Sequence, residues 1–171
     1  MNPAKHVICN TTLLSNFAVV HRVDLLTQVL AGPLYTTTHV LDEISAGVSA
    51  GYAHLEPLEQ QLLAADSPFV LTPLESQELK TFREARLRLH AGEASCFAIA
   101  LHREFVFGTD DLAARKIARA NKVAVIGTVG VMVLCRRGVL PLADANQILQ
   151  QMIDAGYRSP VPRLDEFWKI D

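Results

Sequence analysis

Short apolar runs alternate along the chain with longer segments in which apolar residues recur at helical spacing. The short runs fall at residues 6–9, 34–37, 69–71, 105–107 and 123–126. Runs of this length predict β-strands, although residues 69–71 also fit an extended link. The longer segments predict helices at residues 13–17, 23–30, 38–44, 55–65, 73–89, 91–101, 114–119, 131–135 and 143–155.

Strands that alternate with helices are typical of a parallel sheet with helices on both faces. We therefore predict an α/β fold, a three-layer α/β/α sandwich around a central parallel sheet of about five strands. No repeat or long linker divides the sequence, so we expect a single domain over residues 1–171, with a core at about 5–155 and a C-terminal tail at 156–171. The tail is expected to be irregular and carries the only tryptophan, Trp168.

Local signals place two of the helix boundaries. Thr38 is the expected N-cap of a helix that ends at Gly47. Residues 72–75, Thr-Pro-Leu-Glu, have the form of a capping box with proline at the first helical position.

The composition narrows the class of protein. Half of the 171 residues are hydrophobic, and no apolar run approaches the ~20 residues of a membrane helix. Because the N-terminus also lacks a basic-then-apolar signal pattern, we expect no membrane association and a cytoplasmic location.

The sequence has three cysteines, Cys9, Cys96 and Cys135, all in apolar segments. Their odd number and apolar surroundings favour buried reduced thiols over a disulfide or a metal site. The net charge of -2 argues mildly against a strong non-specific nucleic-acid binder, although acidic site residues could mask local basic patches.

Candidate chemistry gathers where predicted strands end in polar residues. Asp110 and Asp111 follow the run at 105–107 and precede a helix, while Asn10 and Thr128 follow two other strands. The carboxyl ends of parallel strands meet at one edge of the sheet, which is where open α/β sheets bind ligands. We therefore expect these side chains to converge.

Two more carboxylates, Glu43 and Glu93, belong to helices placed near the same edge. Gathered carboxylates repel one another unless a cation neutralises them, and hard oxygen ligands suit Mg²⁺ or Mn²⁺. Such sites most often serve phosphoryl transfer or phosphodiester hydrolysis. Each residue also has a structural alternative: Asp110 and Asp111 as helix caps, Glu43 as a surface residue, and Glu93 as a first-turn residue favoured by the helix dipole.

Five motifs, by their order and spacing, resemble the PIN-domain family, and they are closest to its toxin ribonucleases of prokaryotic toxin–antitoxin pairs. They are NTTLLSNF at residues 10–17, LDEI at 41–44, GEA at 92–94, TDDxxARK at 109–116 and GTVGV at 127–131. The resemblance covers roughly residues 5–155. It implies a PIN-like fold with a five-stranded parallel sheet, and an endoribonuclease dependent on Mg²⁺ or Mn²⁺ with three or four acids at the sheet edge.

By position, the resemblance also implies roles for these acids. Glu43 corresponds to the second acid of the family and Glu93 to the third, while Asp110 and Asp111 share the fourth place. Asn10 stands where most of the family has its first aspartate, and it keeps one oxygen ligand but loses a negative charge. The implied metal ligands are Asn10, Glu93 and Asp110 or Asp111.

Contacts with an RNA substrate are implied in the same way. Thr11 or Thr12 matches the hydroxyl residue beside the first acid, and Thr128 is placed to hold a phosphate or water. Two basic segments fit either an RNA groove or a solvated helix face. They contain Arg115, Lys116 and Arg119, and Lys80, Arg83 and Arg86.

Three functions follow for comparison. The first is a metal-dependent endoribonuclease, the toxin of a pair with a small antitoxin protein, forming a homodimer as the family commonly does. The second is a catalytically weak PIN domain that binds RNA or a protein partner, which Asn10 motivates. The third, a phosphoacceptor of the response-regulator type, is disfavoured because no acid accompanies Asn10 after the first strand. The six histidines have no pairing suited to zinc, so no zinc site is expected.

Overall fold

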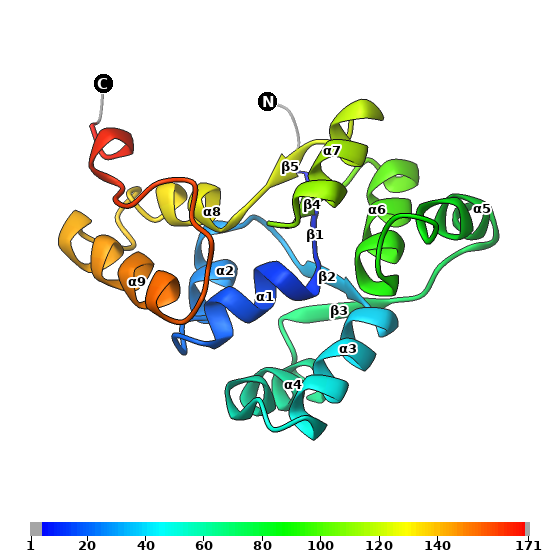
Figure 1. Ribbon diagram of the computed structural model, residues 1–171, viewed down its shortest axis with the longest axis horizontal. Helices are drawn as coiled ribbons and strands as arrows, with labels where there is room; N and C mark the ends of the chain where they lie inside the picture. The colour runs from blue at the N-terminus through cyan, green and yellow to red at the C-terminus, as the bar shows by residue number, and fades with distance from the viewer. Residues whose placement is uncertain (1–4, 170–171) are drawn as a thin grey trace.

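The computed structural model describes residues 5–169 and contains a central sheet of parallel strands in the order β3-β2-β1-β4-β5 (Figure 1). The first residues of the N-terminal segment and the last two residues of the predicted tail lie outside this range. The strands are β1 (Val7–Cys9), β2 (Leu34–Thr37), β3 (Phe69–Thr72), β4 (Val106–Gly108) and β5 (Val125–Ile126). All five apolar runs therefore form strands, including the one at residues 69–71 that also fitted an extended link.

Helices cover both faces of this sheet. They are α1 (Thr11–Ala18), α2 (Asp24–Val29), α3 (Thr38–Ser49), α4 (Glu56–Leu63), α5 (Ser76–Ala85), α6 (Ala91–Arg103), α7 (Leu112–Ala120), α8 (Thr128–Leu134) and α9 (Leu142–Asp154). In Figure 1, α5, α6 and α7 lie on one side of the sheet and α1, α2, α8 and α9 on the other. The predicted three-layer α/β/α arrangement is thus confirmed. Nowhere in residues 5–169 is there a helix with the length and apolar character needed to cross a membrane.

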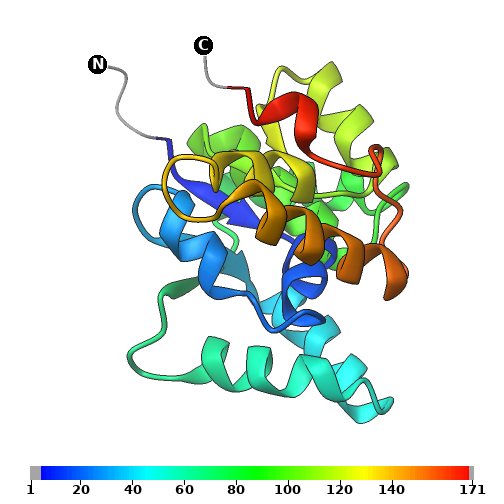
Figure 2. The same ribbon diagram turned by 90° about the vertical axis from the view of Figure 1, so that its left-hand side faces the viewer.

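The C-terminal tail packs against the last two helices. Figure 2 shows it, in red, returning past α9. The Asn146 side chain of α9 accepts a hydrogen bond from the backbone N–H of Leu164 at 2.7 Å, and Leu164 is fully buried. Arg136, just after α8, donates to the carbonyl of Phe167 at 2.7 Å. The tail is irregular apart from one 3-10 turn (Asp165–Phe167), yet these contacts hold it in a defined position.

The boundary predicted for α3 was wrong at both ends. Thr37, not Thr38, caps the helix, because the Thr37 hydroxyl accepts from the N–H of Val40 at 3.2 Å. Gly47 lies inside the helix instead of ending it. The side chain of Leu55 occupies the space beside Gly47, where an added Cβ would lie 2.5 Å from the Leu55 methyl group. Glycine is therefore explained here by packing rather than by termination.

The capping box expected at residues 72–75 was also wrong. Thr72 is the last residue of β3, where it pairs with Thr37 of β2. Helix α5 begins four residues later than Thr72, and Glu75 is its N-cap. The Glu78 carboxylate accepts from the N–H of Glu75 at 2.7 Å, so the box is formed by two glutamates.

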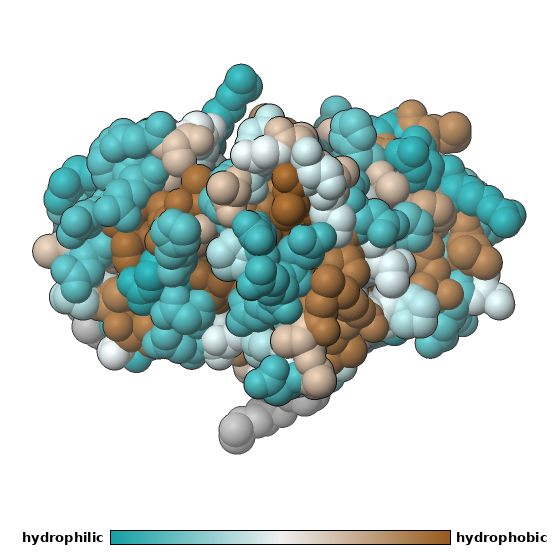
Figure 3. All heavy atoms as spheres, turned by 90° about the horizontal axis from the view of Figure 1, so that it is seen from below, coloured by the Kyte–Doolittle hydropathy of each residue, from teal (hydrophilic) through white to brown (hydrophobic). Residues whose placement is uncertain are grey.

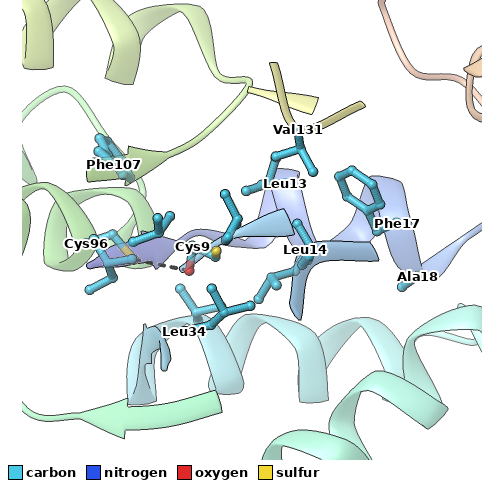
Figure 4. Packing of buried hydrophobic residues seen from close by; sticks show 14 of the residues in the cluster. Cys9, Leu13, Leu14, Phe17, Ala18, Leu34, Cys96, Phe107 and Val131 are labelled. Atoms are coloured by element: carbon cyan, nitrogen blue, oxygen red, sulfur yellow. Dashed lines mark hydrogen bonds between the residues drawn. The ribbon is translucent and has the colours of Figure 1, made fainter. Parts of the chain in front are cut away.

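The hydrophobic core joins α1 and α8 to the middle of the sheet (Figure 4). Leu13 packs so closely on β4 that a Cβ at Gly108 would lie 2.7 Å from its methyl group. Cys9 and Cys96 are buried together, with the Cys96 thiol 3.6 Å from the carbonyl of Cys9. All three cysteines are free and buried, as predicted, and burial raises the pKa of Cys9 to about 12. These thiols therefore belong to the core.

The surface carries large hydrophobic side chains on separate elements. Leu112 is 82% exposed at the start of α7, Leu87 is 86% exposed after α5, and Leu63 is 62% exposed at the end of α4. In the view from below, hydrophobic patches are divided by hydrophilic side chains (Figure 3). Single exposed hydrophobic residues are common on monomeric proteins, so the homodimer remains a prediction.

An internal ion pair fastens α5 to α6 and β3. Arg103 of α6 donates from Nε and Nη2 to the two oxygens of Glu78 at 2.6 and 2.9 Å, and from Nη1 to the Thr72 hydroxyl at 2.9 Å. Glu78 is fully buried. Burial alone would raise the pKa of Glu78, but the hydrogen bonds from Arg103 and from the N–H of Glu75 lower it below the ordinary value. The bidentate geometry makes this a strong, charge-assisted contact.

We predict that Glu78→Gln destabilises the protein by about 3 kcal/mol at neutral pH, because it removes the buried carboxylate bonded to Arg103 and leaves Arg103 only its longer ion-pair contact of 3.7 Å with the exposed Glu75. A lowered folded-state pKa contributes stability that is present above about pH 4.3 and is lost as the pH falls through the folded-state value. The difference in free energy of unfolding between wild type and variant should therefore shrink at low pH. Urea unfolding at pH 7 and pH 3 measures it, with the exposed Glu84→Gln as the control. A pH-independent difference would contradict the assignment.

Candidate functional site

The carboxyl edge of the sheet brings three strand ends side by side. Cys9 of β1 is in register with Gly108 of β4, which pairs in turn with Ile126 of β5. The pattern continues one residue further, where the N–H of Asn10 donates to the carbonyl of Gly108 at 3.0 Å. Helices α1, α7 and α8 all begin directly after these strand ends. Their N-terminal N–H groups and dipoles favour negative charge at this edge.

Asn10 is fully buried and links β1 to β4. Its amide oxygen accepts from the N–H of Leu13 at 3.2 Å and from the Thr12 hydroxyl at 2.9 Å, so it caps α1. Its amide nitrogen donates to the hydroxyl of Thr109 at 2.8 Å. The Thr109 hydroxyl also accepts from the N–H of Asp111 at 3.1 Å. Asn10 thereby fixes Thr109, and Thr109 fixes the backbone of Asp111.

Glu43 ties α3 to α1 and α6. One carboxylate oxygen accepts from the N–H of Gly92 at 2.8 Å, and the other accepts from the Thr11 hydroxyl. An added Cβ at Gly92 would lie 2.8 Å from the carboxyl carbon of Glu43. Only glycine leaves room for this carboxylate, which explains the Gly-Glu pair at the start of α6. Both oxygens of Glu43 are already bonded within the protein.

Glu93 is nearly buried in the first turn of α6, with 9% of its surface exposed. One of its oxygens accepts from the N–H of His90 at 3.1 Å. Burial raises the pKa of Glu93, and the charges of Asp111 and Glu43 raise it further, while the His90 bond opposes them. The charges of Glu43 and Asp111 both act on Glu93, and we call these three residues the acidic cluster.

The neighbours Asp110 and Asp111 have different partners. Asp111 caps α7 by accepting from the N–H of Ala114 at 2.7 Å. Asp110 is bonded to the start of α8, where it accepts from the N–H of Thr128 at 3.0 Å and from its hydroxyl at 2.5 Å. Asn16 at 3.2 Å and the Tyr157 hydroxyl at 3.2 Å also donate to Asp110.

Two of these partners were missed by the sequence analysis. Asn16 lies one helical turn after Thr12, a spacing that could have placed it at the site. Tyr157 has no such signal, because it comes from the segment after α9. Burial and the charge of Asp110 raise the pKa of Tyr157, so it stays a hydrogen-bond donor.

Some of the predicted substrate-binding residues lie at the carboxyl edge of the sheet, and others lie elsewhere. Thr11 and Thr12 bond to Glu43 and Asn10, and Thr128 is engaged by Asp110. On α7, Arg115 donates to the carbonyl of Thr109 at 2.9 Å, whereas Lys116 is exposed. The other basic segment is on α5, the outermost helix of its layer in Figure 1. Its three residues, Lys80, Arg83 and Arg86, are exposed there.

This fold and edge agree with one comparison of the sequence. A family model described as a PIN domain matches residues 6–169. The chain belongs to the PIN-domain family. The PIN domain is a nuclease-type fold, and PIN domains generally use divalent metals. Comparisons with curated proteins and with solved structures gave no match.

The donor oxygens of this PIN domain fit a hard divalent cation only in part. Within residues 5–169, no three His, Cys, Asp or Glu side chains form a ready-made metal site. Glu93 and Asp111 each use one oxygen as a helix cap, and no protein group in this range donates to the other oxygen. Mg²⁺ is commonly held by one or two carboxylates with waters and substrate phosphates. The oxygen of Asn10, in contrast, already accepts two hydrogen bonds.

We predict that Asn10→Ala lowers the free energy of unfolding by about 2–3 kcal/mol, because it removes the cap of α1 and leaves Thr109 without its buried donor. Chemical denaturation measures the change. The control is Asn121→Ala, which removes an exposed asparagine whose side chain bonds only to Ile117 of its own helix. Similar losses for both variants would show that the link between β1 and β4 contributes little.

Proposed function

We propose that this PIN domain is a ribonuclease that hydrolyses phosphodiester bonds in RNA with Mg²⁺ or Mn²⁺. The observation that carries the proposal is the acidic cluster, in which Glu93 is almost buried beside the charges of Asp111 and Glu43. Like charges crowded at a buried edge favour a bound cation. When bound, the metal would activate water for attack and neutralise charge on the phosphate.

In this proposal, two acids bind the metal and two other residues position them. Glu93 and Asp111 hold the metal through the oxygens that do not cap helices. Glu43 positions Glu93 through its bond to the N–H of Gly92, and Asn10 positions Asp111 through Thr109. Groups that orient metal ligands in this way commonly change metal affinity or activity 10–100-fold when removed.

Asp110, in contrast, is proposed to position α8. Its oxygens accept from Thr128, Asn16 and Tyr157. This assignment favours Asp111 as the acid in the family's fourth place.

A second function is supported by Asn10. Its neutral side chain occupies a fully buried place between the ends of β1 and β4, and both ends of its amide are bonded to the protein. Without the usual charge, the acidic cluster holds a cation more weakly. A PIN domain of this kind would bind RNA or a protein partner with little cleavage. The roles of toxin, partner of a small antitoxin protein and homodimer rest on the resemblance of the motifs alone.

We expect Glu93→Gln and Asp111→Asn each to reduce RNA cleavage by at least ~100-fold, because each removes one of two charged ligands. Cleavage of a labelled single-stranded RNA with Mn²⁺ measures this. Asp42→Asn, an exposed change beside Glu43 on α3, is the matched control and should cleave like wild type. If Asp110→Asn abolishes cleavage in folded protein while Asp111→Asn does not, the two acids have been assigned the wrong way round.

Restoring the acid tests the second function. Asn10→Asp adds a carboxylate that can bind the same cation, so Mn²⁺ affinity and RNA cleavage should both rise by about ten-fold or more. Isothermal titration with Mn²⁺ and the cleavage assay measure the two effects. No change in either would mean that the missing charge at position 10 does not limit function.

A further inference from the structure

A second feature of this edge is a groove of about 460 Å³ that begins at Asp110 and runs beside β5. Its apolar lining includes Val125, Ile126 and Val129. Three arginines also line it: Arg115 and Arg119 from α7, and Arg158 from the segment after α9. The groove therefore combines an apolar surface with guanidinium groups contributed by two distant parts of the sequence.

The three arginines outnumber the acids of the groove, where Asp110 carries one opposing charge. The ion pairs found in residues 5–169 involve none of the three. Asp110 is the only acidic residue among the described groove residues, and its carboxylate accepts hydrogen bonds from Thr128, Asn16 and Tyr157. In a chain with a net charge of -2, this groove is a local concentration of positive charge.

Arg115 and Arg119 are held on one face of a helix. They are four residues apart on α7, so their side chains lie one above the other. Arg115 is fixed by one bond from Nη1 to the carbonyl of Thr109 at 2.9 Å. Its other nitrogens have no carboxylate partner in the described chain, so they remain available to an anion.

Arg158 is presented by a segment that is fixed on both sides. Tyr157 donates its hydroxyl to Asp110 at 3.2 Å, and its N–H to the carbonyl of Met152 at 2.9 Å. The chain can turn sharply before it because Gly156 has a φ of +109°, which favours glycine. After Arg158, the Ser159 hydroxyl donates to the carbonyl of Val161 at 2.6 Å. These bonds fix the backbone at Arg158, so less backbone ordering is needed when its exposed side chain binds an anion.

We infer that this groove binds the phosphodiester backbone of single-stranded RNA next to the bond to be cleaved, with Arg158 and Arg119 as its principal phosphate contacts. The inference rests on the proposed function and adds the path of the substrate. Guanidinium groups bind phosphates through paired N–H donors. The apolar side chains beside them offer a contact surface to bases, which are accessible in a single strand and paired inside a duplex. The tail, which lies outside the predicted core at 5–155, thus becomes part of the substrate site.

The test is binding of a fluorescein-labelled single-stranded oligouridylate in EDTA, where no metal-dependent cleavage occurs. Arg119→Gln/Arg158→Gln should weaken binding by at least ~10-fold, and it should reduce the slope of log affinity against log salt by about 1.4, since each lost phosphate contact on a single strand contributes about 0.7. Lys122→Gln/Arg137→Gln is the matched control. It removes the same charge from exposed residues outside the groove lining and should bind like wild type.

Other outcomes would overturn the inference. Equal affinity and equal salt slope in the groove variant and the wild type would do so, as would an equal loss in the control variant. Groove-dependent binding of polyglutamate without binding of the oligouridylate would point instead to an acidic protein partner.

The cleavage assay with Mn²⁺ separates this inference from the proposed function. In the groove variant, KM should rise while kcat stays within about two-fold, because Arg119 and Arg158 are not among the residues proposed to hold the metal. If the wild type cleaves RNA and the groove variant has the same KM, the groove inference is rejected and the ribonuclease proposal stands. If the wild type binds RNA through the groove but does not cleave it, the groove inference stands and the ribonuclease proposal is rejected.

Discussion

The hydrogen bond between Asn10 and Thr109 joins the end of the central strand β1 to the end of its neighbour β4, and the position of Asp111 in the acidic cluster depends on it. β1 and β4 are parallel and neighbouring, but their carboxyl ends lead into different helices. Asn10 begins α1 with its oxygen and holds Thr109 with its nitrogen, and Thr109 then holds the backbone of Asp111. A single buried amide thus sets the cap of one helix and the position of a carboxylate on another. Because the amide is fully buried, removal of either partner leaves an unsatisfied polar group.

The carboxylates at this edge reach their positions through separate local bonds. Glu93 and Asp111 each cap a helix with one oxygen, and Glu43 bridges α1 and α6 with both. Glu93 and Asp111 therefore have the structural roles that the sequence alternatives gave them, whereas Glu43 is not the plain surface residue of its alternative. The structural role does not exclude a chemical one, because a cap uses only one oxygen of a carboxylate. The same bonds that begin the helices also orient the remaining oxygens of Glu93 and Asp111, the two ligands of the proposed metal site.

The strands and most helices could be predicted because burial imposes a periodicity that is visible in the sequence. Predictions of element boundaries were wrong where a contact with another part of the chain determines the local structure. Gly47 lies inside α3, where the packing of Leu55 leaves no room for a side chain, and Thr72 stays in β3, where Arg103 bonds to its hydroxyl. At the site, the order of the acids was visible, but the difference between Asp110 and Asp111 was not. Asp110 is bonded to Tyr157, which lies 47 residues further along the chain. No local pattern carries that information.

At position 10, a neutral side chain favours the metal-free fold, whereas a carboxylate would favour metal binding. The position is fully buried and is linked through Thr109 to Asp111, whose charge already acts on Glu93. An aspartate there would add another buried charge of the same sign, which is unfavourable until a cation neutralises it. Thr109 could still bond to it, since a hydroxyl both donates and accepts. Asparagine keeps the link between the strands without that repulsion, and in the proposed site it leaves Glu93 and Asp111 as the charges that a cation would meet. Under the proposed function, the charge at this edge, rather than its architecture, would therefore set how strongly a metal is held.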